Sequence, residues 1–336
     1  MGIEKPFKDA AFRKGMNILT GELSDKRLKQ PPAMKKSILK RFTSQLYVQA
    51  MVIPGILWMI IFCYIPIYGL IIAFKEFNIV KGILESPWVG FAHFKEFLGS
   101  GNLPLLLRNT LGLSFLNLLL GFPLPIIFAL FLNELKFNKF KKIVQTASYL
   151  PHFISWVIIG GMFLNWLSVE GLINELLVKT GLMAEPKLFM TEPLWSWIVL
   201  IGTNIWKSFG WNSVIFLAAI SSVDQGMYEA AVIDGANRLQ RMWYITFPAI
   251  QATVAIMFII NMSTVLNSNF DQIIIMRNSI IRDYVDVIDT YTYDIGLGMG
   301  RYSYASAVGL LKSFIALVLL WVSNSVSKKL TNQQLF

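Results

Sequence analysis

The sequence predicts an all-α membrane protein with six transmembrane helices, and three observations support this fold class. Hydrophobic residues make up 55% of the 336 positions and charged residues only 15%, whereas a soluble domain of this length needs far more polar surface. Six apolar runs are each long enough to cross ~30 Å of hydrocarbon, which takes about 20 helical residues. None of these runs alternates apolar and polar residues as the strands of a β-barrel do.

The six runs differ in their polar residues and in their prolines and glycines. The first is too long for the apolar core of a signal peptide, so it predicts a retained span. The fourth and the sixth each contain an internal lysine, Lys207 and Lys312, and we expect Lys207 to pair with a carboxylate or a bound acidic sugar. Five prolines and the Gly160–Gly161 pair predict kinks within the spans or interruptions of their regular hydrogen bonding; the prolines are Pro54, Pro66, Pro123, Pro125 and Pro151. The predicted spans are 47–74, 107–133, 143–166, 194–220, 244–268 and 303–325.

Basic residues predict the orientation, because loops that stay in the cytoplasm are enriched in Lys and Arg. The arm 1–46, the loop NELKFNKFKK and the tail 326–336 are all rich in lysine, whereas the loop near 167–193 is rich in glutamate. The sequence therefore predicts cytoplasmic N and C termini on either side of a six-helix domain at 47–325. The polar segment 221–248 then lies in the cytoplasm as well.

The net charge of +10 has a plain explanation in this topology. Basic residues on the cytoplasmic side attract anionic lipid headgroups, so membrane lipids rather than nucleic acid are the expected partner of this charge. Cys63 is the single cysteine, which excludes a disulfide framework and a cysteine metal site within the chain.

The sequence predicts no catalytic residue, no metal site and no cofactor in this chain. The two histidines, His93 and His152, belong to no HExxH motif. Ser114 and Ser155 lie in apolar surroundings with no base beside them in the sequence. A GxxxxGK[ST] loop is absent as well, so the chain does not hydrolyse a nucleotide by the P-loop route, and energy must come from a partner or an ion gradient.

The segment EAAVIDGANRLQRMWYITFP, 229–248, interrupts the apolar pattern with two carboxylates and two arginines. Upstream, Ser222 and Asp224 can accept hydrogen bonds from free N–H groups at a helix start. Gly235 follows Asp234, a strong turn signal. The pattern predicts two short helices that meet at a bend, the second leading into the fifth span; a solvated loop is the alternative.

The spacing of this segment resembles the EAA loop of ATP-binding-cassette importer permeases, EAA-x3-G-x9-I-x-L-P. The DGA core is common in the sugar-transporting members, and Phe247 replaces the usual Leu. In that family this loop forms a coupling helix that docks on the ATPase. The resemblance implies coupling roles for Glu229, Ala230, Ala231, Asp234, Gly235, Ala236, Arg238, Ile245 and Pro248.

The resemblance covers most of the chain. TLGLSFLNLLLGFPLPIIFALFLNEL, QTASYLPHFISWVIIGGMF, FDQIIIM, VIDTYTYDIGL and YSYASAVGLLKS are similar to the LplB-like branch of the sugar permeases, which takes up polysaccharides or complex carbohydrates. It implies the type I importer (MetI-like) fold in a bacterial cell membrane and a transport role rather than an enzymatic one. The implied partners are a second homologous permease, two ATPase subunits that carry ATP and Mg, and a lipid-anchored or periplasmic solute-binding protein.

Polar residues within the fourth and fifth predicted spans are the candidates for a carbohydrate pathway. Sugars are recognised by aromatic faces and by amide or charged groups, and polar groups at bilayer depth usually face a cavity or the bundle interior. For each asparagine, hydrogen bonding between helices is the alternative, and for each tryptophan a place in the interfacial belt. The candidates are Asn204, Trp206, Lys207, Trp211, Asn212, Asn261, Asn267 and Asn269.

Two other function classes fit the sequence less well than an importer permease. A secondary transporter driven by an ion gradient usually has a longer chain with internal repeats, and no clear repeat is present. An intramembrane enzyme acting on lipid-linked sugars needs clustered Asp, His or Ser within the spans, and Asp is largely confined to the loops.

Overall fold

The computed structural model describes residues 46–267 and 269–331. The predicted arm therefore lies outside the described residues except for Leu46, as do the last five residues of the tail. The chain divides into two compact units, of which the first ends at Tyr68. Its described part is helical throughout, and a π-helical turn ends at Tyr64, two residues before Pro66, whose missing N–H leaves a carbonyl of the preceding turn free. The elements are α3 (Leu46–Met59), η1 (Ile60–Tyr64) and α4 (Ile65–Ile67).

The second unit begins at Gly69 and is also helical. Its described residues form no β-strand, only two isolated bridges, Lys75 to Trp88 and Asn78 to Gly82. The elements are η2 (Tyr68–Phe74), α5 (Gly82–Glu85), α6 (Ala92–Leu98), α7 (Leu103–Gly121), α8 (Pro123–Asn133), α9 (Asn138–Tyr149), η3 (Leu150–Phe153), α10 (Trp156–Trp166), α11 (Leu172–Lys179), η4 (Phe189–Thr191), α12 (Pro193–Ser221), α13 (Gln225–Ile233), α14 (Arg238–Arg241), η5 (Met242–Thr246), α15 (Phe247–Ala249), α16 (Gln251–Ser263), α17 (Phe270–Met276), α18 (Arg282–Val285), α19 (Ile288–Tyr293), η6 (Asp294–Gly298) and α20 (Tyr302–Thr331).

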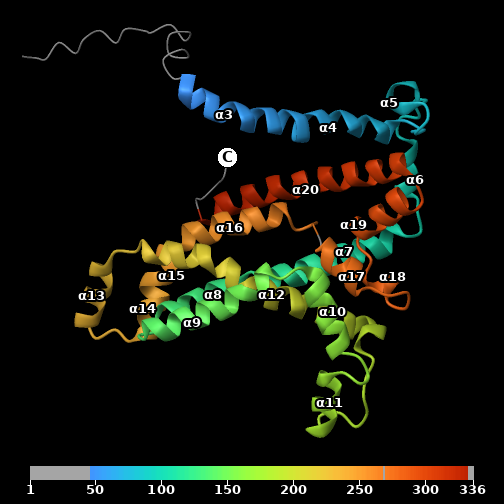
Figure 1. The fold of residues 1–336 in the computed structure, drawn as a ribbon. Coiled ribbons are helices and arrows are strands. Elements are labelled where there is room, and N and C mark those ends of the chain that lie inside the picture. The colour runs from blue at the N-terminus through green and yellow to red at the C-terminus, as the bar shows by residue number, and fades with distance from the viewer. Residues whose placement is uncertain (1–45, 268, 332–336) are drawn as a thin grey trace, which may run out of the picture. The chain divides into compact units, whose positions relative to one another are not determined.

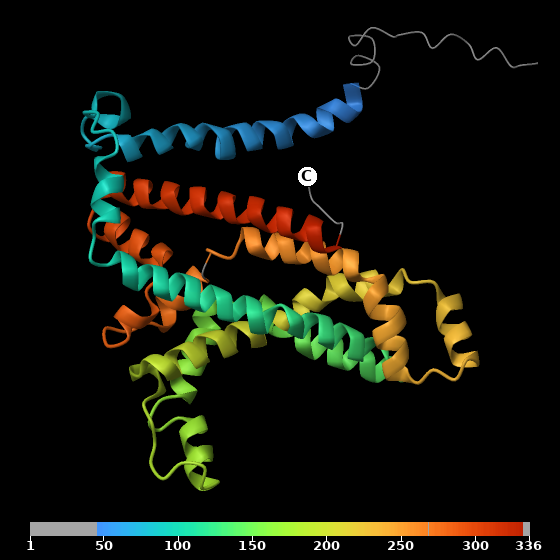
Figure 2. The ribbon, with the colours of Figure 1, turned by 180° about the vertical axis from the view of Figure 1, so that it is seen from behind.

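Helix α12 is the central element of the second unit. It packs against α7, α8 and α9 and also contacts α16, α17 and α18. Helices α16 and α20 lie side by side, as Figures 1 and 2 show from opposite sides, and α13 and α14 lie together at one end of the bundle. The central position of α12 makes it the scaffold on which polar side chains from several helices meet.

Three of the described helical runs are long and apolar enough to cross a membrane: Gln49–Phe74, Leu103–Asn133 and Tyr302–Ser325. They coincide closely with the first, second and sixth predicted spans. The second is continuous through Phe122, because Pro123 and Pro125 occupy positions at the start of α8 where their missing N–H groups are tolerated. Helix α12 coincides with the fourth predicted span, 194–220, and its 29 residues are long enough. It is nevertheless too polar to be one of these three runs, because asparagines and Lys207 interrupt it.

The third and fifth predicted spans are each broken into two helices. The helix pair Asn138–Phe153 and Trp156–Trp166 bends by 99°, and the pair Arg238–Ala249 and Gln251–Ser263 bends by 61°. A proline lies shortly before each break, Pro151 in the first pair and Pro248 in the second. The fifth span also ends early, because α16 stops at Ser263 instead of continuing to 268.

Two packed cores lie on either side of a polar zone along α12. Because lipid is as apolar as these side chains, close packing rather than exclusion of water holds such cores together within a bilayer. One core joins α12 to α7 and α17 through Leu113, Leu200, Ile201, Ile273 and Met276. The other joins α12 to α8, η5 and the break before α16 through Ile126, Leu130, Phe216, Ile220, Met242 and Ile250.

Candidate functional site

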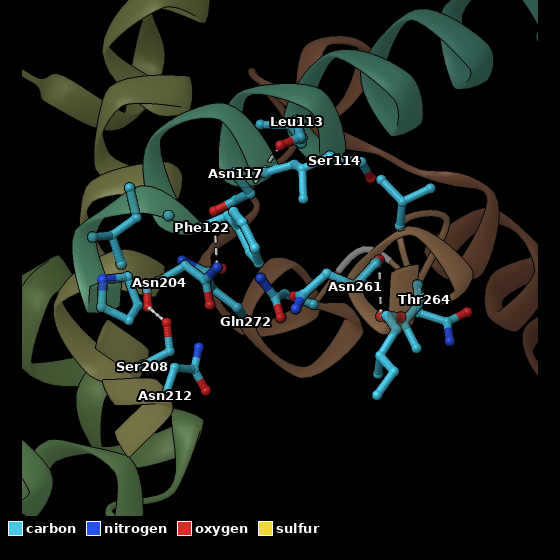
Figure 3. Close-up of a pocket in the computed structure, with 18 of the residues that line it drawn as sticks. Leu113, Ser114, Asn117, Phe122, Asn204, Ser208, Asn212, Asn261, Thr264 and Gln272 are labelled. Carbon is cyan, nitrogen blue, oxygen red and sulfur yellow. Dashed lines mark hydrogen bonds between the residues drawn. The ribbon is translucent and has the colours of Figure 1, made fainter. Parts of the chain in front are cut away.

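A cavity of about 360 Å³ lies between these two cores. Figure 3 shows its polar side chains converging from α7, from α12 and from the α16–α17 region. Phe122 and Phe216 supply aromatic surface, and amide and hydroxyl groups supply hydrogen-bonding capacity. The polar lining residues are Ser114, Asn117, Asn204, Ser208, Asn212, Asn261, Thr264, Asn267, Asn269 and Gln272.

The amides of this cavity are held in place by hydrogen bonds between helices. Asn204 donates from Nδ2 to Oδ1 of Asn117 over 2.8 Å, which links α12 to α7. Gln272 is buried and donates from Nε2 to Oγ1 of Thr203 and to the carbonyl of Leu200, each over 2.7 Å. Asn261 donates to the carbonyl of its own helix at Met257 over 2.8 Å. These bonds position the amides without using all of their hydrogen-bonding groups.

Five of the eight predicted pathway residues line this cavity, namely Asn204, Asn212, Asn261, Asn267 and Asn269. The two tryptophans do not. Trp206 packs edge-on against Phe163, and Trp211 stacks on the His152 ring at a centroid distance of 4.8 Å. The five asparagines therefore lie at the cavity, whereas the two tryptophans pack against other rings; the pathway role of the asparagines stays a prediction.

Lys207 lies beside the cavity, and its partner differs from the predicted one. Its Nζ donates to the carbonyls of His152 (2.7 Å), Ile154 (2.8 Å) and Pro151 (3.3 Å) and stands 5.6 Å from the centre of the Trp156 ring. No carboxylate pairs with it among the described residues. Carbonyls take the place of the predicted carboxylate, because the break after Pro151 frees backbone carbonyls that a lysine can satisfy. The other predicted partner, a bound acidic sugar, stays a prediction.

A second cavity of about 480 Å³ contains Lys207 and shares part of its wall with the first. Asn204, Ser208 and Asn269 line both cavities. The ammonium group therefore stands next to the amide-lined space rather than inside it. Lys312, the other lysine within a predicted span, does pair with a carboxylate, 2.5 Å from Oδ1 of Asp289 on α19.

Sequence reasoning missed Asn117 and Gln272. Asn117 is an isolated amide within an apolar run, the same signal that singled out Asn204, and it could have been found in the second span. Gln272 lies in the segment taken for a loop, so no burial was expected there. Both became recognisable only when α7 and α17 were placed against α12.

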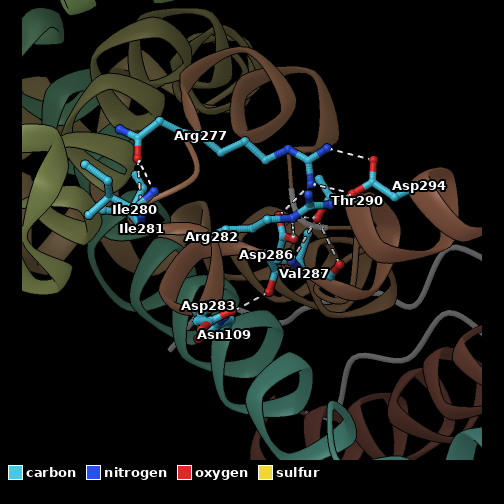
Figure 4. Close-up of polar contacts among 11 residues, drawn as sticks. Asn109, Arg277, Ile280, Ile281, Arg282, Asp283, Asp286, Val287, Thr290 and Asp294 are labelled. Atoms are coloured by element: carbon cyan, nitrogen blue, oxygen red, sulfur yellow. Dashed lines mark hydrogen bonds and ion pairs between the residues drawn. The ribbon is translucent and has the colours of Figure 1, made fainter. Parts of the chain in front are cut away.

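A network of charges fixes the segment after α17, as Figure 4 shows. Arg277 contacts Asp286 at 2.7 Å and Asp294 at 2.8 Å, and all three side chains are mostly buried. Burial alone lowers the pKa of the Arg277 guanidinium, but its hydrogen bonds to Asp294 and Asp286 raise that pKa above its ordinary value. The half-exposed Arg282 joins both carboxylates from outside. This network holds α17, and with it Gln272, against the cavity.

The polar segment 221–248 has the predicted form of two short helices meeting at a glycine turn. Helix α13 begins at Asp224, whose carboxylate accepts from the N–H of Gly226 over 2.9 Å. It ends before Gly235, which has φ of +78°, a value that favours glycine. Asn237 and Gln240 then form a reciprocal capping box that starts α14.

The predicted coupling residues in this segment divide by exposure. Glu229, Ala230, Asp234, Gly235, Arg238 and Pro248 are exposed, whereas Ala231, Ala236 and Ile245 are half-buried. Exposed apolar side chains accompany the polar ones, with Met227 49%, Val232 55% and Leu239 57% exposed. A surface that mixes small, apolar and charged residues is suited to contact with another protein.

The described residues contain no cluster of three or more His, Cys, Asp or Glu side chains that could hold a metal ion.

Comparison with known proteins shows which family has this sequence and this fold. Residues 121–332 match the family described as "binding-protein-dependent transport system inner membrane component". Protein LplB of Bacillus subtilis (strain 168) is 42% identical over 287 residues, which cover 85% of this chain and 90% of that protein. The polygalacturonan/rhamnogalacturonan transport system permease protein YteP of the same organism is 40% identical over 303 residues, covering 90% and 94%.

Solved structures agree with these relatives. The crystal structure of a bacterial ABC transporter involved in the import of the acidic polysaccharide alginate contains a chain 39% identical to this one, with a TM-score of 0.80, covering 87% of this chain and 99% of that chain. A second structure, of a bacterial alginate ABC transporter in complex with an alginate pentasaccharide-bound periplasmic protein, gives 37% identity and a TM-score of 0.81, covering 89% and 99%.

The helical bundle, its internal polar cavity and these similarities define a transport subunit of an ABC importer rather than an enzyme. The chain belongs to the family of binding-protein-dependent transport system inner membrane components and has their MetI-like permease fold. Within that family it is similar to LplB and YteP.

Proposed function

We propose that this chain is a permease subunit that imports oligosaccharides or polysaccharides delivered by a solute-binding protein. The observation that carries the proposal is the cavity lined by seven amide side chains and two phenylalanine rings, with a lysine beside it. Amides bond sugar hydroxyls, and aromatic faces pack on the apolar sides of sugar rings. A relative that transports polygalacturonan or rhamnogalacturonan and a similar structure from an alginate importer favour an acidic polymer.

The proposed topology has six spans, with α12 as the fourth and both termini in the cytoplasm. The polar character of α12 fits a span surrounded by other helices, since such a span faces little lipid. The lysine-rich loop after α8 and the segment 221–248 then lie on the cytoplasmic side, in agreement with the positive-inside rule. The arm 1–46 and the tail 326–336 flank this domain on the same side.

The proposed energy source is a pair of ATPase subunits that bind ATP and Mg, and the exposed surface of α13 and α14 is their docking site. Small residues at Ala230 and Gly235 allow close approach, and Glu229 and Arg238 supply oriented charge. A second, similar permease completes the pathway. Movement of the ATPases would then shift the helices that surround the amide cavity.

Reconstitution of the complete importer tests this function. The chain is co-expressed with its neighbouring permease, ATPase and binding-protein genes and assayed in vesicles with galacturonate and alginate oligosaccharides. We expect the ATPase to co-purify and the binding protein loaded with an acidic oligosaccharide to stimulate hydrolysis. Uptake that follows an imposed ion gradient and ignores ATP would favour a secondary transporter instead.

A further inference from the structure

Glu134 and Arg241 form an ion pair between two segments that are far apart in the sequence. Arg241 ends α14 within the polar segment 221–248, and Glu134 follows the last residue of α8. Arg241 Nη2 lies 3.5 Å from Glu134 Oε2, and the two side chains are only 21% and 18% exposed. Charges this well shielded interact more strongly than a surface pair, and leaving either one alone is costly.

The position of Glu134 makes a purely stabilising role a poor explanation of this pair. A carboxylate at the C-terminal end of a helix faces the unfavourable end of the helix dipole. Arg241 compensates for it, yet its own Nε is buried and has no hydrogen-bond partner among the described residues. The contact is therefore incompletely satisfied in this state, which leaves room for another arrangement of the same two segments.

Arg241 is also connected to α13 by hydrogen bonds through Thr246. Tyr228 of α13 lies 2.9 Å from Oγ1 of Thr246 through its hydroxyl, and Thr246 is fully buried. Thr246 in turn donates to the carbonyl of Arg241 over 3.4 Å. Beside this polar chain, Met242 packs into the core that contains Ile126 and Leu130 of α8. Both polar and apolar contacts thus connect α13 to α8.

The helical run Leu103–Asn133 continues this connection to the amide cavity. Asn117, which holds Asn204, precedes Glu134 by 17 residues, or about 26 Å of helix at 1.5 Å per residue. We propose that Glu134 and Arg241 are a positioning pair that transmits movement of the docking segment through α8 and α7 to the substrate cavity. This inference rests on the proposed function, because it presumes an ATPase that moves α13.

Charge reversal in the complete importer tests the pair. Vesicles are prepared with Glu134→Lys, with Arg241→Glu and with both changes, and ATP hydrolysis is compared with uptake of a galacturonate trimer. We expect each single variant to retain the ATPase and to hydrolyse ATP, but to use about tenfold more ATP per sugar. The double variant should recover most of the coupling, because opposite charges face each other again.

Lys136→Glu is the matched control, since Lys136 is exposed two residues after Glu134, and it should couple normally. Glu134→Gln and Arg241→Gln supply milder changes in case a reversal prevents insertion, and each should raise the ATP used per sugar. The inference would be overturned if inserted single variants used as little ATP per sugar as the wild type. It would also be overturned if the correctly assembled double variant used as much ATP per sugar as the single variants. If the wild-type chain failed to retain an ATPase at all, the proposed function itself would be wrong.

Discussion

Asn204 of α12 and Asn117 of α7 are joined amide to amide across the cavity wall, with Nδ2 of Asn204 2.8 Å from Oδ1 of Asn117. Asn117 also donates to the carbonyl of Leu113 in its own helix over 2.9 Å, so its orientation is fixed before it meets Asn204. The pair sets the distance between two helices that line the cavity and leaves the carbonyl oxygen of Asn204 available to a ligand.

Asn204→Leu should therefore weaken transport without preventing insertion. The change removes one hydrogen bond and leaves Oδ1 of Asn117 unpaired, which costs about 1–3 kcal/mol. We expect the half-saturating sugar concentration in uptake assays to rise by roughly five- to tenfold, as the loss of one or two such bonds implies. For Asn204→Gln, which keeps the amide, the half-saturating concentration should lie between those of the wild type and Asn204→Leu. Unchanged affinity in Asn204→Leu would remove this pair from the pathway.

Lys207 stabilises the broken third span, so Lys207→Met should lower the stability of the protein. Three carbonyls lose their common donor, and leaving such groups unpaired costs about 1–3 kcal/mol in total if water reaches some of them. Thermal unfolding in detergent should begin several degrees lower for this variant, while Lys207→Arg, which retains donors, should unfold near the wild type. Equal unfolding temperatures for Met and wild type would show that the carbonyls are satisfied without the lysine.

Gly210 allows α12 to approach α9 so closely that a side chain cannot be accommodated there. A Cβ at Gly210 would lie 2.1 Å from the carbonyl oxygen of Ser148, whereas a Cβ at Gly202 of the same helix would meet nothing within 4 Å. Gly210→Ala should destabilise the protein by about 1–3 kcal/mol through overpacking. Gly202→Ala is the matched control and should be neutral or slightly stabilising. Equal unfolding temperatures for the two variants would contradict the close approach.

Arg277 and Arg282 share two carboxylates but differ in burial, with side chains 13% and 50% exposed. Arg277→Met leaves buried carboxylates without their main partner and should cost about 3–5 kcal/mol. Arg282→Met removes a more exposed contact and should cost less than half of that. Chemical denaturation of both variants measures this difference in the free energy of unfolding. A larger destabilisation by Arg282→Met would show that Arg282, and not Arg277, is the main partner of the two carboxylates.

The parts of this molecule that depend on local sequence were predictable. The spans 107–133 and 303–325 follow from long, predominantly apolar runs, and the turn at Gly235 follows from an Asp-Gly pair between helix signals. The 99° break after Pro151 was not predictable, because a proline reveals a weak point but not the direction in which neighbouring helices pull the chain.

The cavity likewise has features that the sequence predicts and features that depend on tertiary packing. Sequence alone marks amides such as Asn204 as costly at bilayer depth, which is enough to suspect a polar interior. It does not reveal that Asn117 is the partner of Asn204, since the two lie 87 positions apart and meet only through tertiary packing. Lys207 donates to carbonyls instead of pairing with a carboxylate, because the direction of the bend after Pro151, which places these carbonyls beside the lysine, does not follow from the sequence.

The segment around Gly235 is proposed to couple an ATPase to transport, and Gly235→Val tests this role most directly. A β-branched residue is strained at φ of +78° by about 1–2 kcal/mol, although nothing lies within 4 Å of the added Cβ. The decisive measurement is the ATP hydrolysed per sugar imported by the reconstituted importer, with Gly235→Asn, which tolerates this conformation, as control. We predict a ratio about tenfold higher for Val than for Asn or wild type; an unchanged ratio in fully assembled Gly235→Val importer would contradict the account.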